Sequence, residues 1–133
     1  MTYREAINLG EKVLNMADVA DAKIDAWLLL EMVCKIDRSF YYLHMEDEVA
    51  EEQLSEYEIA LRKRAEHVPL QYIVGEAEFM GLKFKVNSNV LIPRQDTETL
   101  VEEALKVVKP GMKVLDMCTG SGCLAILLAE KFP

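Results

Sequence analysis

The stretch VLDMCTGSGCLAILLAEKF, residues 114–132, decides the fold of the carboxyl-terminal part of this chain. It opens with apolar residues of the kind that fill a buried strand of a parallel sheet. Gly120 and Gly122 follow, and glycines at this spacing let a backbone approach a ligand closely. The periodicity after the turn predicts a helix whose inward face begins with Ala125, Leu128 and Ala129. We therefore expect a strand, a glycine turn and a helix whose amino end faces a nucleotide-containing cofactor.

The glycine turn alone fits more than one ligand. Residues 120–125, Gly-Ser-Gly-Cys-Leu-Ala, also satisfy the G-x-G-x-x-G/A pattern of dinucleotide-binding turns. Asp116, at the end of the predicted strand, argues against a dinucleotide, because a carboxylate beside the turn would repel a pyrophosphate. The same carboxylate suits S-adenosylmethionine, which has no phosphate and carries a sulfonium and an ammonium group. The alternative is that Asp116 only caps the turn.

Composition excludes several classes of protein. The 133 residues are 51% hydrophobic and 29% charged, and they suffice for one ordinary domain or for a small domain with part of a second. No apolar stretch approaches the roughly 20 residues of a membrane span, and the amino terminus lacks the layout of a secretory signal. We therefore expect a cytoplasmic protein that does not contact a membrane.

The three cysteines, Cys34, Cys118 and Cys123, are odd in number and lack a C-x-x-C spacing. They predict neither a disulfide framework nor a metal site. Cys118 lies inside the glycine turn, where a nucleophilic role is the alternative, but neither His44 nor His67 is near it in the sequence. We expect reduced cysteines without a catalytic role.

The net charge of −8 is concentrated in the amino-terminal half. Residues 1–74 hold 15 acidic and 8 basic side chains, whereas residues 75–133 hold 8 and 7. An acidic surface disfavours direct contact with nucleic acid, which needs basic residues, and favours a basic protein partner. The simpler interpretation is a solvated helical surface.

The first 67 residues are expected to form a helical bundle with helices over residues 3–14, 21–36, 40–44 and 46–65. The second helix is apolar over most of its circumference and should be central. Asp37 or Ser39 can cap the third, and its aromatic run Phe40-Tyr41-Tyr42 either stacks on a partner or, as we favour, packs into the core. The fourth helix opens with Glu46-Asp47-Glu48, and its inward stripe consists of Ala50, Leu54, Tyr57, Leu61 and Ala65.

The pattern of residues changes from helical to β-prone after Pro69. Residues 71–74 are β-prone, and residues 78–80 and 84–86 flank a Gly81-Leu82 turn, which predicts a β-hairpin. A helix capped by Asp96 should follow and end at Lys109-Pro110-Gly111. Its inward residues are expected to be Leu100, Val101, Ala104, Leu105 and Val108.

The apolar strand predicted over Met112–Met117 needs a neighbouring strand on each edge and helices on both faces. Only one helix follows it in this sequence, so its backbone groups and flanks cannot be satisfied. We therefore expect the chain to be an amino-terminal piece of a longer protein. Its parts would be a helical domain over residues 1–70, a hairpin linker over residues 71–95 and an incomplete domain over residues 96–133.

Four segments carry motifs in a fixed order. They are Arg64 with Pro69-Leu70-Gln71-Tyr72-Ile73 and Gly75, Phe79-x-Gly81-Leu82-x-Phe84-x-Val86, Val90-Leu91-Ile92-Pro93-Arg94-x-x-Thr97-Glu98, and Leu115-Asp116-x-Cys118-Thr119-Gly120-Ser121-Gly122-Cys123. Together these segments resemble the release-factor glutamine methyltransferases, the HemK/PrmC family. The resemblance covers about residues 64–126. Residues 1–63 are similar to the family's substrate-recognition domain only in length, helical character and position.

The resemblance implies a mixed fold, in which a helical bundle and a β-hairpin linker precede the first βα unit of a Rossmann-like, S-adenosylmethionine-dependent methyltransferase sheet. It also implies a reaction and a partner. The methyl group of S-adenosylmethionine would pass to the side-chain amide nitrogen of the glutamine in the Gly-Gly-Gln loop of class I peptide-chain release factors.

The resemblance also assigns site residues. Asp116 would anchor the turn or the cofactor ammonium, and the residues around the amino-acid part of the cofactor would be Cys118, Thr119, Gly120, Ser121 and Gly122. Arg94, Thr97 and Glu98 would line the cofactor entrance, or Arg94 and Glu98 would form an ion pair between hairpin and helix. Cys118 stands where many glycine-turn methyltransferases have glycine, and we expect an ordinary backbone conformation there.

The catalytic Asn-Pro-Pro-Tyr motif of the family is absent from the 133 residues. No catalytic residue is therefore assigned, and we expect this chain alone to be inactive although its parent is an enzyme. Two alternatives stay open. One is another amino-methyltransferase, acting on nucleic-acid bases. The other is a helical protein-interaction module without catalysis.

Overall fold

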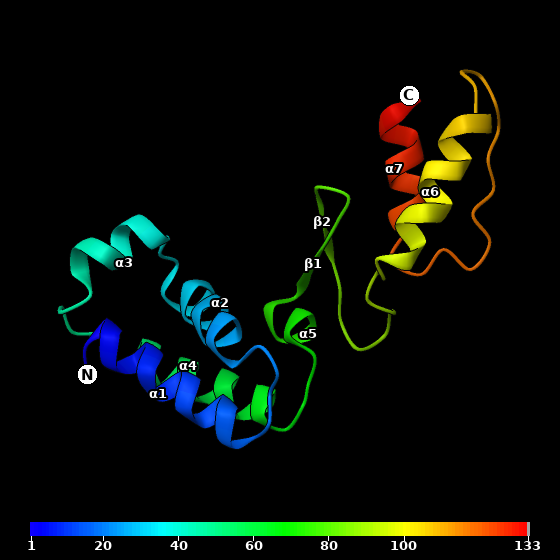
Figure 1. Cartoon of the computed structure of the whole chain (residues 1–133). Coiled ribbons are helices and arrows are strands. Elements are labelled where there is room, and N and C mark those ends of the chain that lie inside the picture. The colour runs from blue at the N-terminus through cyan, green and yellow to red at the C-terminus, as the bar shows by residue number, and fades with distance from the viewer. Residues whose placement is uncertain (133) are drawn as a thin grey trace. The chain divides into compact units, whose positions relative to one another are not determined.

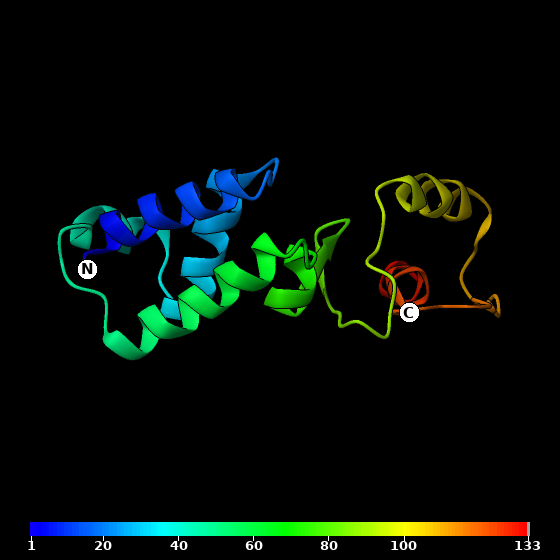
Figure 2. The same ribbon diagram turned by 90° about the horizontal axis from the view of Figure 1, so that it is seen from below.

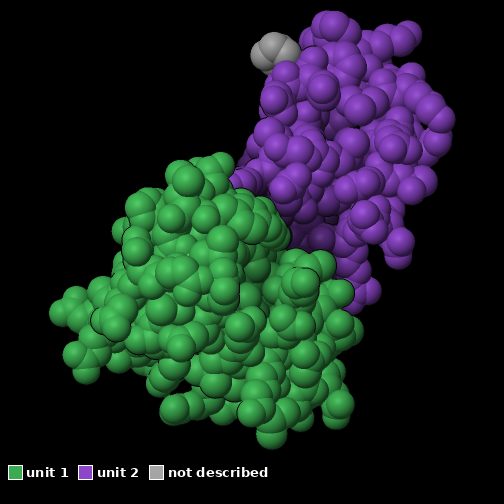
Figure 3. All heavy atoms as spheres, turned by 60° about the vertical axis from the view of Figure 1, so that its left-hand side comes forward, with its two compact units in different colours: residues 1–74 green, residues 75–133 purple. Residues whose placement is uncertain are grey.

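The computed structural model describes residues 1–132, which form two compact units, Met1–Val74 and the residues from Gly75 onward (Figure 3). The first unit is helical (Figure 1). Its elements are α1 (Tyr3–Met16), α2 (Ala22–Cys34), α3 (Arg38–His44), α4 (Glu51–Ala65) and α5 (Leu70–Val74). The domain boundaries expected at residues 70 and 95 stay a prediction.

Local side chains fix where α1 and α3 begin. Thr2 accepts a hydrogen bond from the Glu5 N–H at 3.2 Å, and the Glu5 carboxylate accepts one from the Thr2 N–H at 2.8 Å. These reciprocal bonds satisfy backbone donors that a helix leaves free at its start. Asp37 accepts from the Phe40 N–H at 2.7 Å and so caps α3. Of the two caps considered for this helix, Asp37 is therefore the one used.

Helices α1, α2 and α4 pack around one apolar core, with α2 in contact with both of the others (Figures 1 and 2). Helix α2 is central, because Ala26, Leu29 and Leu30 are completely shielded from solvent. The other buried members are Tyr3, Ala6, Leu14, Val19, Ala22, Cys34, Val49, Tyr57, Ala60 and Leu61. The helical spacing of apolar residues thus places the core where it is expected.

Tyr57 ties the three helices together. Its side chain is 1% exposed, and its hydroxyl donates a hydrogen bond to the Ala26 carbonyl at 3.0 Å. Burial raises the pKa of Tyr57 well above its ordinary value, so the hydroxyl stays protonated and remains a donor. Gly10 of α1 lies under the ring, and a Cβ there would overlap the hydroxyl and lie 3.0 Å from the ring carbon Cζ. The contact therefore requires glycine at position 10.

A second polar contact joins α4 to α2. The Arg64 guanidinium donates through Nε to Asp25 at 2.7 Å and through Nη1 to the Val68 carbonyl at 3.2 Å. Asp25 is 6% exposed, so removal of Arg64 would leave a buried carboxylate uncompensated. The pair also holds the backbone that leaves α4.

The start of α4 differs from the expectation. The helix begins at Glu51, not at residues 46–48. Thr2 and Glu48 form an isolated antiparallel bridge, so the backbone before α4 is extended along the start of α1. A helix cannot make these bonds, which join residues far apart in the sequence. The acidic run before α4 is therefore a loop.

Residues 71–74, which are β-prone by composition, lie in the short helix α5 instead. The Pro69 carbonyl accepts hydrogen bonds from the N–H groups of Tyr72 at 3.0 Å and Ile73 at 3.3 Å. In this conformation Leu70, Ile73 and Val74 pack against the first core. Packing therefore overrides the local β propensity, which is a weak preference.

The second unit contains β1 (Glu76–Phe79), β2 (Leu82–Lys85), α6 (Asp96–Val107) and α7 (Cys123–Lys131). The strands pair antiparallel, with Glu76 opposite Lys85 and Phe79 opposite Leu82, which confirms the predicted hairpin. Its turn is Met80-Gly81, one residue earlier than expected, with φ angles of 47° and 82°. Two-residue hairpin turns of this hand need positive φ at both positions.

The second unit has a small core of its own. Its buried residues are Phe79, Phe84, Val101, Cys123 and Leu127. Hence one face of the hairpin and the facing sides of α6 and α7 are apolar. No helix among residues 1–132 is long and apolar enough to cross a membrane.

The strand predicted over Met112–Met117, and with it the first βα unit of a Rossmann-like sheet, is not formed in this structure. The segment is irregular, and Leu115 and Met117 are 83% and 80% exposed. A parallel strand needs hydrogen-bonded neighbours, and residues 1–132 pair no strand with this segment. An apolar run cannot become a strand without those partners.

The faces of α6 and α7 also differ in part from the expectation. Gln95 occupies the N-cap of α6, and Asp96 is its first residue and gives no side-chain cap. Val101 is buried as predicted, but Leu100 is 57% exposed. On α7 the exposed residues include Ala125 and Ala129, whereas the buried ones are Cys123, Leu127 and Leu128. The hairpin side chains, not the predicted strand, decide which face of α7 is covered.

The fit between Gly10 and Tyr57 makes a prediction. Gly10→Ala should destabilise the chain by about 1–3 kcal/mol, because an added methyl group overpacks this contact. Tyr57→Phe should cost about 1 kcal/mol through the lost hydrogen bond. The double variant should be more stable than Gly10→Ala alone, because the overlapping oxygen is gone. Urea unfolding followed by the fluorescence of the single tryptophan, Trp27, measures all three.

Strictly additive losses in this double-mutant cycle would contradict the described contact.

Candidate functional site

The glycine turn, residues 116–122, joins the irregular segment to α7. The Thr119 hydroxyl donates a hydrogen bond to the Asp116 carboxylate at 2.7 Å. The Gly122 N–H donates to the Thr119 carbonyl at 3.0 Å. Two short-range bonds therefore shape the turn before any ligand is considered. Asp116 does serve the turn, and its second carboxylate oxygen accepts no hydrogen bond within residues 1–132.

Three turn residues adopt left-handed backbone conformations. Their φ angles are 59° at Cys118, 60° at Gly120 and 82° at Gly122. The expectation of an ordinary conformation at Cys118 is therefore wrong. A left-handed residue with a Cβ costs roughly 1–2 kcal/mol, so cysteine is strained at a position that favours glycine. Cys118 lies between Asp116 and Thr119, whose side chains are hydrogen-bonded to each other.

The turn has open space beside Gly120. A Cβ added at Gly120 would meet no heavy atom within 4 Å. Gly122 is the N-cap residue of α7, and no side chain caps the helix. The first N–H groups of a helix lack intrahelical partners and carry a partial positive charge. The turn can thus offer backbone donors to a carboxylate or hydroxyl, with the Asp116 carboxylate beside them.

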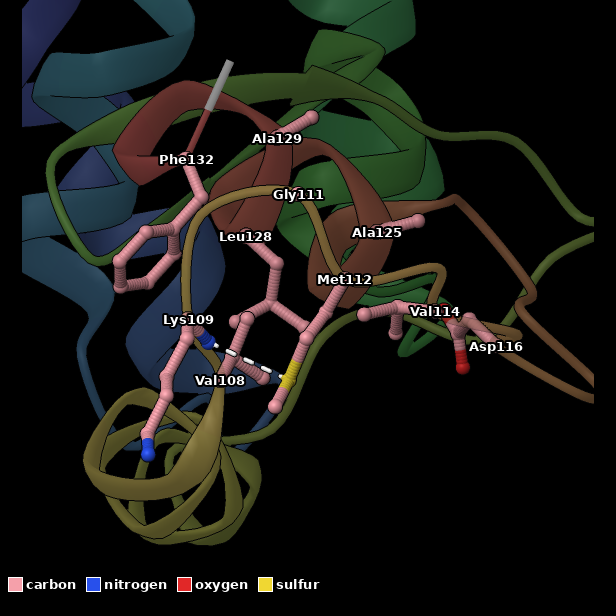
Figure 4. Close-up of a pocket in the computed structure, with 10 residues that line it drawn as sticks. All are labelled: Val108, Lys109, Gly111, Met112, Val114, Asp116, Ala125, Leu128, Ala129 and Phe132. Atoms are coloured by element: carbon pink, nitrogen blue, oxygen red, sulfur yellow. Dashed lines mark hydrogen bonds between the residues drawn. The ribbon is translucent and has the colours of Figure 1, made fainter.

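A pocket of about 200 Å³ lies between the irregular segment and α7 (Figure 4). Ala125, Leu128 and Ala129, the predicted inward face of α7, line one side of it. The rest of its lining comes from Val108, Lys109, Gly111, Met112, Val114, Asp116 and Phe132. Asp116 thus belongs both to the glycine turn and to this pocket. This surface of α7, which was expected to cover a strand, faces the pocket and the irregular segment instead.

Arg94, Thr97 and Glu98 lie at the start of α6. The Thr97 N–H donates to the Arg94 carbonyl at 3.0 Å. Arg94 is exposed, and the ion pairs within residues 1–132 include neither Arg94 nor Glu98. The alternative of an Arg94–Glu98 ion pair is therefore not seen. Helices α6 and α7 run side by side in the same direction, so their amino ends share one end of the unit (Figure 1).

The three cysteines differ in their burial. Burial, together with the Glu56 charge, raises the pKa of Cys34 to about 11, so its nucleophilic thiolate is scarce at neutral pH. Cys123 is buried, and Cys118 is exposed on the turn. Within residues 1–132 no group of three or more His, Cys, Asp or Glu side chains is placed to hold a metal ion.

Two features of the turn lie beyond what its sequence pattern indicates. One is the bond from Thr119 to Asp116, although a Thr three residues after an Asp is a spacing that favours such local side-chain bonds. The other is the part of Phe132 and Met112 in the pocket. These two side chains come from opposite sides of the turn, and no local signal brings them together.

The strain at Cys118 gives a prediction. Cys118→Gly should change stability by less than about 0.5 kcal/mol, because relief of a left-handed Cβ offsets the entropy of glycine. Gly120→Ala should cost about 1 kcal/mol, because it places a Cβ at the same kind of backbone angle. Hydrogen exchange of the α7 amides reports both effects. Gly75→Ala, at a φ of 83° outside the turn and with no heavy atom within 4 Å of the added Cβ, is the matched control and should leave α7 unchanged.

Loss of α7 protection in Cys118→Gly, with none in Gly120→Ala, would overturn the backbone angles assigned to the turn.

Comparison with known proteins places this fold and turn in context. Residues 5–75 match the family described as the PrmC N-terminal domain. The chain is 38% identical to the release factor glutamine methyltransferase of Koribacter versatilis, over 100% of this chain and 48% of the relative. It is 38% identical to that of Geobacter sulfurreducens, over 99% of this chain and 46% of the relative. It is 42% identical to the enzyme of Clostridium acetobutylicum, over 98% of this chain and 46% of the relative.

The chain thus spans about half the length of these relatives. The matched portion includes the helical unit, the hairpin and the glycine turn, and it is homologous to the amino-terminal part of a methyltransferase enzyme. Since the family match alone covers more than half of the residues, the chain belongs to the PrmC N-terminal domain family, among the relatives of the release factor glutamine methyltransferases.

Proposed function

We propose that this chain is the amino-terminal half of an S-adenosylmethionine-dependent enzyme that methylates the side-chain amide of the Gly-Gly-Gln glutamine of class I peptide-chain release factors. The observation that carries the proposal is the match to release factor glutamine methyltransferases over nearly the whole chain. The glycine turn lies within that match. Residues 1–70 would then recognise the protein substrate, and residues 96–133 would begin the cofactor-binding domain.

The turn residues fit S-adenosylmethionine better than a phosphate-containing cofactor. Gly120 leaves open space where a side chain would otherwise stand, and the start of α7 has no side-chain cap. The free oxygen of Asp116 offers a negative charge beside these backbone donors. A carboxylate at this place favours an ammonium group and opposes a pyrophosphate. These observations support Asp116 and residues 118–122 as the cofactor-binding set.

The residues at the start of α6 extend this proposal. Thr97 and Glu98 are partly exposed, and Arg94 is exposed. Because α6 and α7 share a direction, the start of α6 and the glycine turn lie toward one end of the unit (Figure 1). We assign Arg94, Thr97 and Glu98 to the entrance of the cofactor site. Their free polar groups suit contacts with the hydroxyls and charged ends of the cofactor.

The chemistry explains what the chain provides and what it does not. S-adenosylmethionine, when bound, supplies a methyl group on a positively charged sulfur. The amide nitrogen that would receive it is a poor nucleophile, because its lone pair is delocalised into the carbonyl. Such a nitrogen needs hydrogen-bond acceptors that orient it, more than it needs a strong base. Asp116 and the turn hold and position the cofactor, whereas the orienting groups belong to the second half of the enzyme.

The division of labour is testable with a chimera. Residues 1–133 joined to the second half of the Koribacter versatilis relative should transfer a methyl group from S-adenosylmethionine to a class I release factor. The 133-residue chain alone should transfer none. Labelled S-adenosylmethionine and mass analysis of the Gly-Gly-Gln peptide measure the product.

Two results would count against this function. One is label transfer by the isolated chain with contamination excluded. The other is a folded, cofactor-binding chimera that methylates nucleic-acid bases but not the release factor.

The turn can be tested in the same chimera. Gly120→Val and Gly122→Val should abolish binding of S-adenosylmethionine, because a β-branched residue resists positive φ and fills the open side of the turn. Cys118→Gly should retain binding and serves as the matched control. Isothermal titration measures the affinities, and circular dichroism checks the fold. Unchanged affinity in both valine variants would show that the cofactor does not lie against this turn.

A further inference from the structure

The excess of negative over positive charge in the first unit comes from one segment. Residues 1–74 hold 15 acidic and 8 basic side chains, and residues 39–61 hold 7 of the acidic ones and no lysine or arginine. The rest of the unit is balanced, with 8 of each sign. The acidic side chains of this segment are all exposed, and they are Glu46, Asp47, Glu48, Glu51, Glu52, Glu56 and Glu58. The segment therefore carries the whole charge excess of the unit.

The same segment contains the exposed apolar ridge of α3, which consists of Tyr42 and Leu43. Leu43 is 81% exposed and Tyr42 is 60% exposed. No residue of α3 is buried, although most of its side chains are apolar or aromatic. Figures 1 and 2 show α3 at the margin of the helical unit, directly before the loop that leads to α4. An apolar ridge that is followed in the sequence by a run of carboxylates is thus open to solvent.

The inner side of α3 fixes the ridge in place. The Tyr41 ring lies edge-on to Trp27 at 5.4 Å, and the Phe40 ring lies edge-on to Tyr3 at 5.9 Å. Arg38 lies 4.8 Å from the centre of the Trp27 ring. The aromatic run is therefore divided between the two roles considered for it, since only Tyr41 packs against the first core, whereas Phe40 is 38% exposed and Tyr42 faces solvent. A side chain held in one position loses little entropy on binding.

The carboxylates beside the ridge are mostly unpaired. Glu46 pairs with Arg4 at 2.6 Å, and Asp47 accepts from His44 at 2.7 Å. The remaining five acidic residues of the segment take part in no ion pair within residues 1–132. Their field favours an approaching cation and repels another acidic surface.

We propose that the α3 ridge and the adjoining acidic segment dock a basic segment of another protein, in which a bulky apolar side chain lies among lysine or arginine residues. The apolar side chain would cover Tyr42 and Leu43, and the basic residues would meet Glu48, Glu51 and Glu52. Tyrosine at the centre of such a patch supplies a large, rigid contact area. A second copy of this chain, a nucleic acid or an anionic membrane would each bring negative charge to the same place. This proposal requires neither the cofactor nor the glycine turn and goes beyond the proposed methyl transfer.

A designed peptide tests the surface. The ¹⁵N-labelled 133-residue chain is titrated with a synthetic 14-residue peptide of leucine and lysine in an amphipathic helical pattern. The changes in the amide NMR chemical shifts on addition of the peptide should concentrate in residues 38–58. Tyr42→Ser with Leu43→Ser should weaken binding at least tenfold. Met16→Ser, which alters an apolar residue that is 78% exposed on α1, is the matched control and should leave affinity unchanged.

Charge and specificity form the second arm. Glu48→Lys with Glu52→Lys should also weaken binding at least tenfold, and a peptide with glutamate in place of lysine should not bind. Unchanged affinity in either double variant, or shifts spread equally over residues outside 38–58, would overturn the proposal. So would a concentration-dependent dimer of the free chain that the serine variant abolishes, because the occupant would then be a second copy. Thermal melting confirms that each variant is folded.

Discussion

The burial of Tyr57 between α1, α2 and α4 is the contact on which the first unit depends. The ring fills the space where the three helices meet, and its hydroxyl must find an acceptor because an unpaired buried donor is costly. The Ala26 carbonyl supplies the acceptor, and the absence of a side chain at Gly10 supplies the space. Arg64 and Asp25 fasten the same two helices at a second point. Because Asp25 and Ala26 are adjacent, both bonds fix the same part of α2 against α4, and the acidic segment and α3 are built on that frame.

Where helices lie was predictable in this unit, because apolar residues recur at the helical period and Asp37 gives a local start signal for α3. The predictions were wrong where distant backbone decided the outcome. The bridge between Thr2 and Glu48 delays α4, and packing against the core turns residues 71–74 into a helix. A pattern within one segment contains no information about a partner forty residues away. The hairpin was predictable for the opposite reason, since its turn and its pairing are both local.

In the glycine turn, too, some features were predictable from the sequence and others were not. Its position follows from the sequence, and its assignment as a cofactor site is still a prediction. Its shape includes a bond from Thr119 to Asp116 that spans Cys118, and Cys118 adopts a left-handed conformation that a residue with a Cβ disfavours. Because the residue is a cysteine and not a glycine, the sequence alone predicted an ordinary backbone conformation at Cys118. A strained non-glycine residue is tolerated when the surrounding bonds determine the backbone more strongly than the residue's own preference.

Two exposed apolar regions of the chain call for different kinds of partner. In α3 the backbone bonds of a helix are already made, so a partner there needs only to cover Tyr42 and Leu43 and balance the nearby carboxylates. In residues 113–117 the apolar side chains of Val114, Leu115 and Met117 are more than half exposed, and the backbone groups of the segment have no hydrogen-bond partner within residues 1–132. Only paired strands satisfy those groups together, and a reversible side-chain contact cannot. The α3 ridge is therefore suited to side-chain contact with the surface of another folded segment. The segment before the glycine turn is suited to pairing with further strands. Such strands would also cover the exposed face of α7.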